Sequence, residues 1–85
     1  MQTEAYGFHM NTTIEVATRI KAAIETAERT PTWVGRKAAI ALTTLNRKLD
    51  GGADFTVGEV HRIAVALRVP TASLLPDDFF EQAVA

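Results

Sequence analysis

The sequence contains no cysteine, and this absence excludes several kinds of site at once. Disulfide bonds, thiolate nucleophiles and cysteine-based zinc sites all need a side chain that the chain does not have. A chain of this composition suits a reducing compartment, so we expect a cytoplasmic protein.

Long hydrophobic runs are also missing. No stretch approaches the roughly 20 consecutive apolar residues that a membrane-spanning helix requires. The first residues do not follow the pattern of a secretory signal peptide, which begins with positive charge. We therefore expect no membrane partner.

Side chains suited to catalysis are scarce as well. Ser73 is the only serine, and no lysine lies near it in the sequence to activate it. The chain contains neither a nucleophile elbow nor a phosphate-binding glycine loop. His61 has no second histidine or acidic cluster at metal-ligand spacing, so we interpret it as a surface residue. These absences predict a protein that is not an enzyme and that uses no metal or cofactor.

The residues that are present indicate one small folded domain. The chain has 85 residues, of which 47% are hydrophobic, and this is enough apolar material for a core. A chain of this length buries only somewhat over half of its unfolded surface, so we expect modest stability.

Apolar residues at helical spacing predict a first helix that follows a cap at Thr12 or Thr13 and runs to about Glu28. The residues before it carry no lysine or arginine, and we interpret residues 1–12 as a flexible leader. The apolar face of this helix consists of Ile14, Ala17, Ile20, Ile24 and Ala27.

A second long helix is predicted near the end of the chain. Thr56 and Glu59 have the spacing of a capping box, and the helix is expected to continue through Arg68 before Pro70 ends it. Its apolar face consists of Val60, Ile63, Ala64 and Leu67.

A shorter helix is expected to follow it, capped by Thr71 and closed by Pro76. This helix contains Leu74 and Leu75. Residues 77–85 form a tail with Phe79 and Phe80 side by side, and this pair is a candidate for a homodimer contact.

The stretch from Thr30 to Gly52 predicts two short helices joined by a tight turn. Thr30 and Thr32 are both candidate N-caps, and Pro31 suits a first helical position. The first helix is expected to end near Ala38 and the second to span residues 41–49, where the paired glycines that follow stop it. The inward positions are Val34, Gly35, Ala38, Ile40, Leu45 and Leu49.

Positive charge is concentrated in this stretch. Residues 29–49 contain five lysines and arginines and no carboxylate, whereas the whole chain has nine cations and ten acids. The net charge is therefore +5 here and −6 over the rest of the chain. A basic helix pair on an acidic body is typical of a DNA-binding surface, although an ordinary solvated helix face remains an alternative.

The outward side chains of the second short helix have the chemistry needed to read DNA. We expect Leu42, Thr43, Thr44, Asn46 and Arg47 to face the bases of the major groove. Arg47 suits guanine, Asn46 suits adenine, and Leu42 suits a thymine methyl group. We expect Thr32, Lys37 and Lys48 to contact phosphates.

The same stretch resembles the helix-turn-helix of the lambda-repressor/Cro-type family, also called XRE-like. The matching positions are Thr30, Val34, Gly35, Ile40, Thr43, Thr44, Leu45 and Gly51. The likeness covers most of the chain from about Val16 to Pro76, and the TTLNRKLDGG run is similar to members carried by phages of actinobacterial hosts. The resemblance implies an all-α, compact domain of four to five helices, acting in the cytoplasm of a bacterial host cell. It also implies that the short helix containing Leu74 and Leu75 contributes to a homodimer contact.

Two positions depart from the family pattern. Ala39 stands at the turn where the family usually has glycine, and Glu28-Arg29 replaces a glycine followed by an apolar residue. If Ala39 adopts a positive φ, the left-handed backbone should cost about 1–2 kcal/mol. These departures concern the geometry of the turns rather than the reading helix.

Together these observations predict a leader (residues 1–12), a helix-turn-helix domain (residues 13–76) and a tail (residues 77–85) that contributes to a dimer. The predicted function is a repressor or Cro-like transcriptional regulator that binds an operator in double-stranded DNA as a homodimer. Two alternatives stay open. One is an antitoxin-like protein-interaction module with the same fold, and the other is a DNA-bending accessory factor for recombination.

Overall fold

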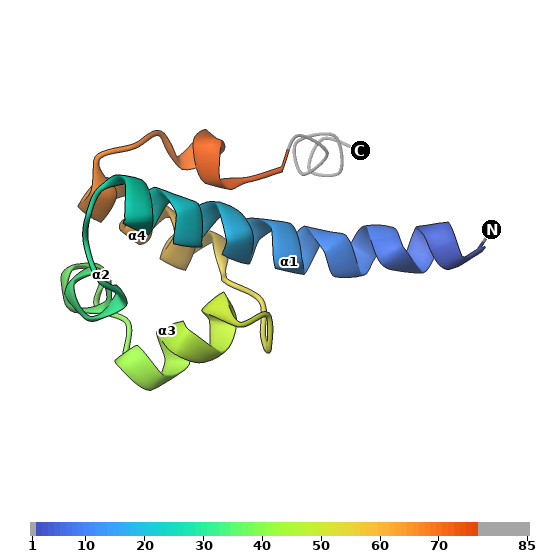
Figure 1. Cartoon of the computed structure of the whole chain (residues 1–85), viewed down its shortest axis with the longest axis horizontal. Coiled ribbons are helices and arrows are strands. Elements are labelled where there is room, and N and C mark those ends of the chain that lie inside the picture. Colours follow the sequence, from blue (N-terminus) through green and yellow to red (C-terminus); the bar gives the residue numbers. More distant parts are fainter. Residues whose placement is uncertain (1, 77–85) are drawn as a thin grey trace.

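The computed structural model describes the backbone of residues 2–76 and the side chains of residues 13–76. Regular structure in this range is entirely helical, and the helices pack around one core (Figure 1). The predicted all-α fold is therefore confirmed. The elements are α1 (Gln2–Thr26), α2 (Pro31–Ala38), α3 (Leu42–Leu49), α4 (Val57–Leu67) and the 3-10 helix η1 (Thr71–Leu74).

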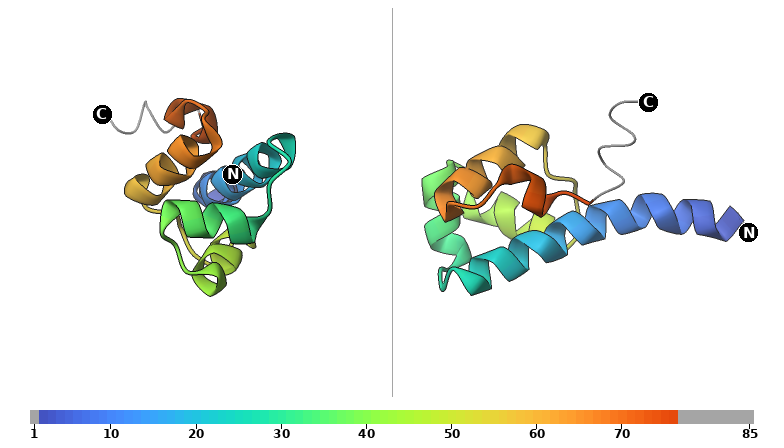
Figure 2. Two further views of the ribbon diagram at one scale, coloured as in Figure 1. Left: turned by 90° about the vertical axis from the view of Figure 1, so that its left-hand side faces the viewer. Right: turned by 90° about the horizontal axis from the view of Figure 1, so that it is seen from above.

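The long helix α1 begins at Gln2, well before the predicted cap at Thr12 or Thr13. Both threonines lie inside the helix, so neither is an N-cap, and the predicted start is wrong. The Thr13 hydroxyl is instead hydrogen-bonded to the Asp54 carboxylate, which ties α1 to the loop before α4. The N-terminal part of α1 extends beyond the other helices (Figures 1 and 2). The flexibility predicted for residues 1–12 stays a prediction.

Helix α2 begins as the sequence indicates. The Thr30 hydroxyl accepts a hydrogen bond from the Trp33 backbone N–H at 3.1 Å, and Pro31 is the first helical residue. Thr30 rather than Thr32 is therefore the cap. The predicted inward residues Val34, Gly35 and Ala38 are all buried.

The turn between α2 and α3 is tight because two backbone segments nearly touch. Ala39 adopts the left-handed conformation, with φ 60° and ψ 44°, so this chain tolerates there the strain that glycine would avoid. A Cβ on Gly35 would lie only 2.8 Å from the Ile40 carbonyl oxygen. Glycine is therefore required at position 35, where α2 and the start of α3 are closest.

Helix α3 ends at the predicted glycine pair. Gly51 has a φ of +85°, and the N–H of Gly52 donates to the Arg47 carbonyl at 2.9 Å. The N–H of Gly51 donates to the Lys48 carbonyl at 3.0 Å. Together these bonds form a Schellman motif, which satisfies the last carbonyls of the helix.

Helix α4 starts with the predicted capping box, in which the Thr56 hydroxyl accepts from the Glu59 N–H and the Glu59 carboxylate accepts from the Thr56 N–H. It ends one residue before Arg68, which adopts the left-handed conformation with φ 61°. The predicted cap at Thr71 is wrong because Thr71 is the first residue of η1 and Pro70 precedes it as the N-cap, without a side-chain bond.

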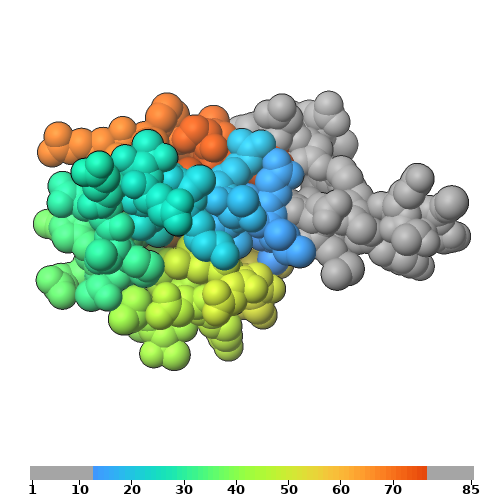
Figure 3. All heavy atoms as spheres, viewed as in Figure 1, coloured from blue at the N-terminus to red at the C-terminus, as the bar shows by residue number. Residues whose placement is uncertain are grey.

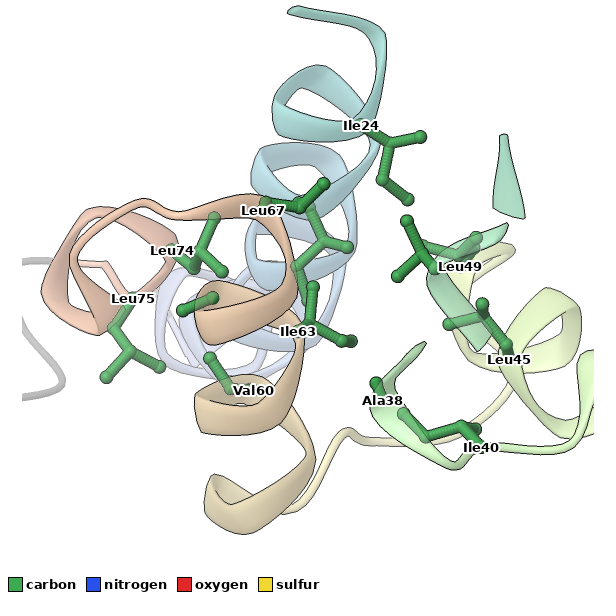
Figure 4. Packing of buried hydrophobic residues seen from close by; sticks show 13 residues of the cluster. Ile24, Ala38, Ile40, Leu45, Leu49, Val60, Ile63, Leu67, Leu74 and Leu75 are labelled. Atoms are coloured by element: carbon green, nitrogen blue, oxygen red, sulfur yellow. The ribbon is translucent and has the colours of Figure 1, made fainter. Parts of the chain in front are cut away.

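The core lies where α1, α2, α3, α4 and η1 meet (Figure 4). Its fully buried side chains include Ile20, Val34, Leu45, Ile63 and Leu74. Phe55 packs against this cluster from the loop before α4. Among the described residues, no helix is long and apolar enough to cross a bilayer.

The core also contains two residues that were predicted to lie in a dimer contact. Leu74 is 2% exposed and Leu75 is 7% exposed, and both pack against the core of their own chain. That part of the dimer prediction is wrong, because η1 folds back on α1 and α4 and turns both leucines inward. The other two predicted contact residues, Phe79 and Phe80, lie outside the described residues.

Candidate nucleic-acid interface

Helix α3 has one buried face and one exposed polar face. Leu45 and Leu49 fix it to the core, whereas Thr43, Asn46 and Arg47 are exposed. In Figure 3 the yellow-green residues of α3 project from one side of the body. A short helix presented in this way can enter a groove of DNA without moving the rest of the domain.

The remaining predicted base-reading residues differ in exposure. Leu42, at the start of α3, is 41% exposed, so its side chain is available for contact with a thymine methyl group. Thr44 is half-buried. The structure therefore brings all five predicted residues onto one short helix, with Thr44 the least accessible of them.

The loop after α3 leaves room for the Arg47 side chain. A Cβ on Gly52 would lie 3.1 Å from the Arg47 Cγ and 3.2 Å from its carbonyl oxygen. A larger residue at position 52 would press against the aliphatic part of the Arg47 side chain, so Gly52 also influences the direction in which that side chain points.

Lys48 does not occupy the outward position that the sequence predicts. It is 9% exposed, and its Nζ lies 2.7 Å and 2.9 Å from the two carboxylate oxygens of Glu59. The lysine therefore joins α3 to the first turn of α4, and its amine is already occupied by a carboxylate. This geometry removes the basis for a phosphate contact at Lys48.

The environment of Glu59 explains why its charge is stable there. Burial acts to raise the pKa of the Glu59 carboxyl, but hydrogen bonds from Lys48 and from the Thr56 backbone N–H, with the lysine charge, outweigh it. The net effect is a pKa below the usual value for glutamate. The capping box was visible in the sequence, but a pair between residues on two different helices has no local sequence pattern.

The two predicted phosphate residues on α2 are exposed but lie in different surroundings. Thr32 is exposed on the first turn of α2. Lys37 is exposed beside Trp33, with its Nζ 5.6 Å from the ring centroid, in a hollow that contains no residue of α3. Arg36, which the sequence-based set omitted, is exposed four residues after Thr32 and thus shares a face of α2 with it.

Four of the five cations of residues 29–49 are exposed, and Lys48 is the exception. Within residues 13–76 the ion pairs are Arg19 with Glu15 and Lys48 with Glu59. Lys48 therefore contributes little net charge to the surface. The exposed cations of the segment are Arg29, Arg36, Lys37 and Arg47.

Arg62 on α4 supports the turn that follows α2. The Arg62 Nε donates to the Ala38 carbonyl oxygen at 2.7 Å, which links α4 to the last residue of α2. This bond satisfies a carbonyl at the C-terminus of α2 and places a positive charge where the helix dipole favours it.

Comparison with known proteins gives one family. A family model described as the BetR domain matches residues 11–85. The match places the chain among small helical domains of a DNA-binding, regulatory type. No curated protein and no solved structure matches the chain. The closer resemblance to the lambda-repressor/Cro-type family stays a prediction.

Proposed function

Because this chain belongs to the BetR domain family, we propose that it is a transcriptional regulator that recognises a specific sequence in double-stranded DNA. The proposed action is that of a phage repressor or Cro-like protein, through binding and not through catalysis. The observation that carries this proposal is the exposed polar face of α3, with Thr43, Asn46 and Arg47 on a helix whose opposite face is fixed in the core.

In the proposed complex α3 lies in the major groove. Arg47 donates two hydrogen bonds to a guanine, and Asn46 pairs with an adenine through its amide. Leu42 packs on a thymine methyl group, and Thr43 and Thr44 contact neighbouring base edges. The fixed buried face of α3 keeps these side chains in register with successive base pairs.

Phosphate contacts hold the domain in that position. The revised set consists of Thr32, Arg36 and Lys37 on α2, because Lys48 is paired with Glu59. Contacts of this kind are independent of sequence and make affinity depend on salt. Two copies bound to a pseudo-palindromic operator would place their α3 helices about 34–36 Å apart, one turn of DNA.

Selection of bound sequences from a random DNA pool tests the proposal. We expect one motif to be enriched and to bind the full chain at least about a thousandfold more tightly than random DNA at physiological salt. Asn46→Ala should lose the preference at one position of that motif. Lys21→Ala, an exposed cation on α1, is the matched control and should leave the motif unchanged.

The other outcomes contradict the proposal and identify the alternatives. Binding without sequence preference, accompanied by bending of the DNA, would indicate the architectural accessory factor. Absence of DNA binding at low salt would indicate the protein-interaction module. Both outcomes are compatible with the fold, so the selection experiment distinguishes function and not folding.

A further inference from the structure

The surface away from α3 contains an open hollow of about 540 Å³ between the start of α2 and the end of α4. It is lined by Ala27, Arg29, Trp33, Lys37, Val65, Ala66, Leu67 and Arg68. No residue of α3 lines it, so the hollow is separate from the proposed base-reading helix, and Lys37 is the residue that it shares with the proposed phosphate contacts. Its volume is in the range of about 300–1,000 Å³ that is typical of ligand sites.

Three cations line this hollow, and two of them lie close to its aromatic ring. The guanidinium of Arg29 lies 4.4 Å from the centroid of the Trp33 ring, and the Nζ of Lys37 lies 5.6 Å from it. Arg68 is contributed by the end of α4, where its backbone is held in the left-handed conformation. No carboxylate lines the hollow. The charge of the rim therefore selects an anionic partner.

Apolar side chains accompany the cations in the lining of the hollow. Among them, Val65 is 62% exposed and Trp33 is half-buried. Exposed apolar side chains next to cations fit a segment in which carboxylates accompany large hydrophobic residues. The phosphate backbone of a nucleic acid would pair with the cations but would leave Val65 exposed to water.

The chain contains one segment of this composition. Residues 77–81 have the sequence DDFFE, with three carboxylates, two phenylalanines and no cation. We propose that the hollow binds residues 77–81 of a second copy of this chain. The two Phe side chains contact Val65 and Trp33, and the carboxylates face Arg29, Lys37 and Arg68.

The course of the chain favours a second copy as the donor of this segment. After α4 the chain turns back through η1 and runs along α1, away from the end of α4 where the hollow lies (Figures 1 and 2). The burial of Leu74 and Leu75 removes these two leucines from the residues that could form a dimer contact. A reciprocal exchange would give each subunit two such contacts with its partner.

Sedimentation of the full chain tests the proposal without DNA. We expect a reversible dimer that Arg68→Glu weakens about tenfold or more, because one substitution reverses a charge on the rim. The double variant Asp77→Lys with Asp78→Lys should weaken it similarly, and the triple variant should recover much of the affinity. Lys21→Glu has the same charge change on an exposed position of α1 and should leave the dimer unchanged.

Trp33 gives a second, direct readout because it is the only tryptophan. A synthetic peptide of residues 77–85 should change the Trp33 emission of the full chain and compete with dimer formation. Arg68→Glu should reduce both effects, and circular dichroism and thermal unfolding confirm that this variant is folded.

Four results would overturn the proposal. The first two are a chain that is monomeric at all concentrations and a dimer that is insensitive to Arg68→Glu. The third is a Trp33 emission that does not respond to the peptide. The fourth is a Trp33 emission that differs between the unmodified chain and the double variant Asp77→Lys with Asp78→Lys at concentrations where both are monomeric, which would show that the segment binds its own chain. Binding of a single half-site of DNA, measured separately, reports the proposed function independently of this contact.

Discussion

The Nζ of Lys48 lies 2.7 Å from one carboxylate oxygen of Glu59, and that same oxygen accepts a hydrogen bond from the Thr56 N–H at 2.8 Å. One carboxylate thus caps α4 and holds the last turn of α3. The proposed reading helix is connected to the body by this polar contact as well as by Leu45 and Leu49.

Removal of one partner of this pair should destabilise the domain. Lys48→Met keeps the length of the side chain but leaves a carboxylate with 14% side-chain exposure without its lysine, and we expect a loss of about 1–3 kcal/mol. Urea unfolding followed by circular dichroism measures it. Lys21→Met on exposed α1 is the control and should be nearly neutral. An equally small effect at Lys48 would show that the pair contributes nothing to stability.

The same pair predicts how stability changes with acid. Since the pKa of Glu59 is lower in the folded chain than the usual 4.5, the folded state favours the ionised carboxylate. The resulting stabilisation is complete above the unfolded pKa and is lost as the pH falls through the lower folded value. Glu59→Gln should therefore cost more stability at pH 7 than at pH 3, by urea unfolding at both values. A difference independent of pH would contradict this assignment.

Arg47→Ala should cost about 1–3 kcal/mol of DNA affinity and relax the preference at one base pair. The reason is that its exposed guanidinium is the best donor on α3 for guanine. Titration of the selected operator and of single-base variants measures both effects. An equal loss on random and selected DNA would show that Arg47 only neutralises phosphate.

Arg36→Gln should weaken binding to all sequences alike and reduce the slope of log affinity against log salt by about one. Lys48→Met provides the contrast, because its amine is bonded to Glu59 and should release no counterion on binding. Titrations at several salt concentrations separate the two. A reduced slope for Lys48→Met would return that lysine to the set of phosphate contacts.

Ala39→Gly should stabilise the domain by up to about 1 kcal/mol. Ala39 has a φ of 60°, which glycine adopts without steric cost, although glycine also gains entropy in the unfolded chain. Ala22→Gly provides the contrast, since Ala22 is exposed inside α1, where glycine costs about 1 kcal/mol relative to alanine. Thermal unfolding should therefore show a higher midpoint for Ala39→Gly and a lower midpoint for Ala22→Gly. A lower midpoint for Ala39→Gly would show that the turn is not strained.

Most of the fold follows from local sequence signals. The cap at Thr30, the capping box at Thr56 and the glycine stop at Gly51 each depend on residues within one turn of a helix, and the structure has all three. The start of α1 was missed because the residues before Thr13 carry no recognisable signal for the beginning of a helix. They also contain no proline, which would have ended the helix in that part of the chain.

The errors at Lys48 and Leu74 have a common cause. Lys48 was assigned from helix periodicity and Leu74 from the family resemblance, but the environments of both are created by contacts with other helices. Periodicity places Lys48 near the boundary of the apolar face, and only the position of Glu59 decides where its amine points. Exposure of Thr43, Asn46 and Arg47 was predictable because Leu45 and Leu49 determine the opposite face.

The contact between Gly35 and the Ile40 carbonyl restricts how this protein can acquire new binding preferences. With only 2.8 Å available to an added Cβ, α2 and the turn after it are already in close contact, and a larger residue at position 35 would force them apart. The position of α3 relative to α2 therefore depends on glycine at position 35, whereas the solvent-facing side chains of α3 can be exchanged without disturbing this contact. Libraries randomised at those exposed positions alone should yield folded proteins with altered operators, whereas larger residues at position 35 should mainly cost stability.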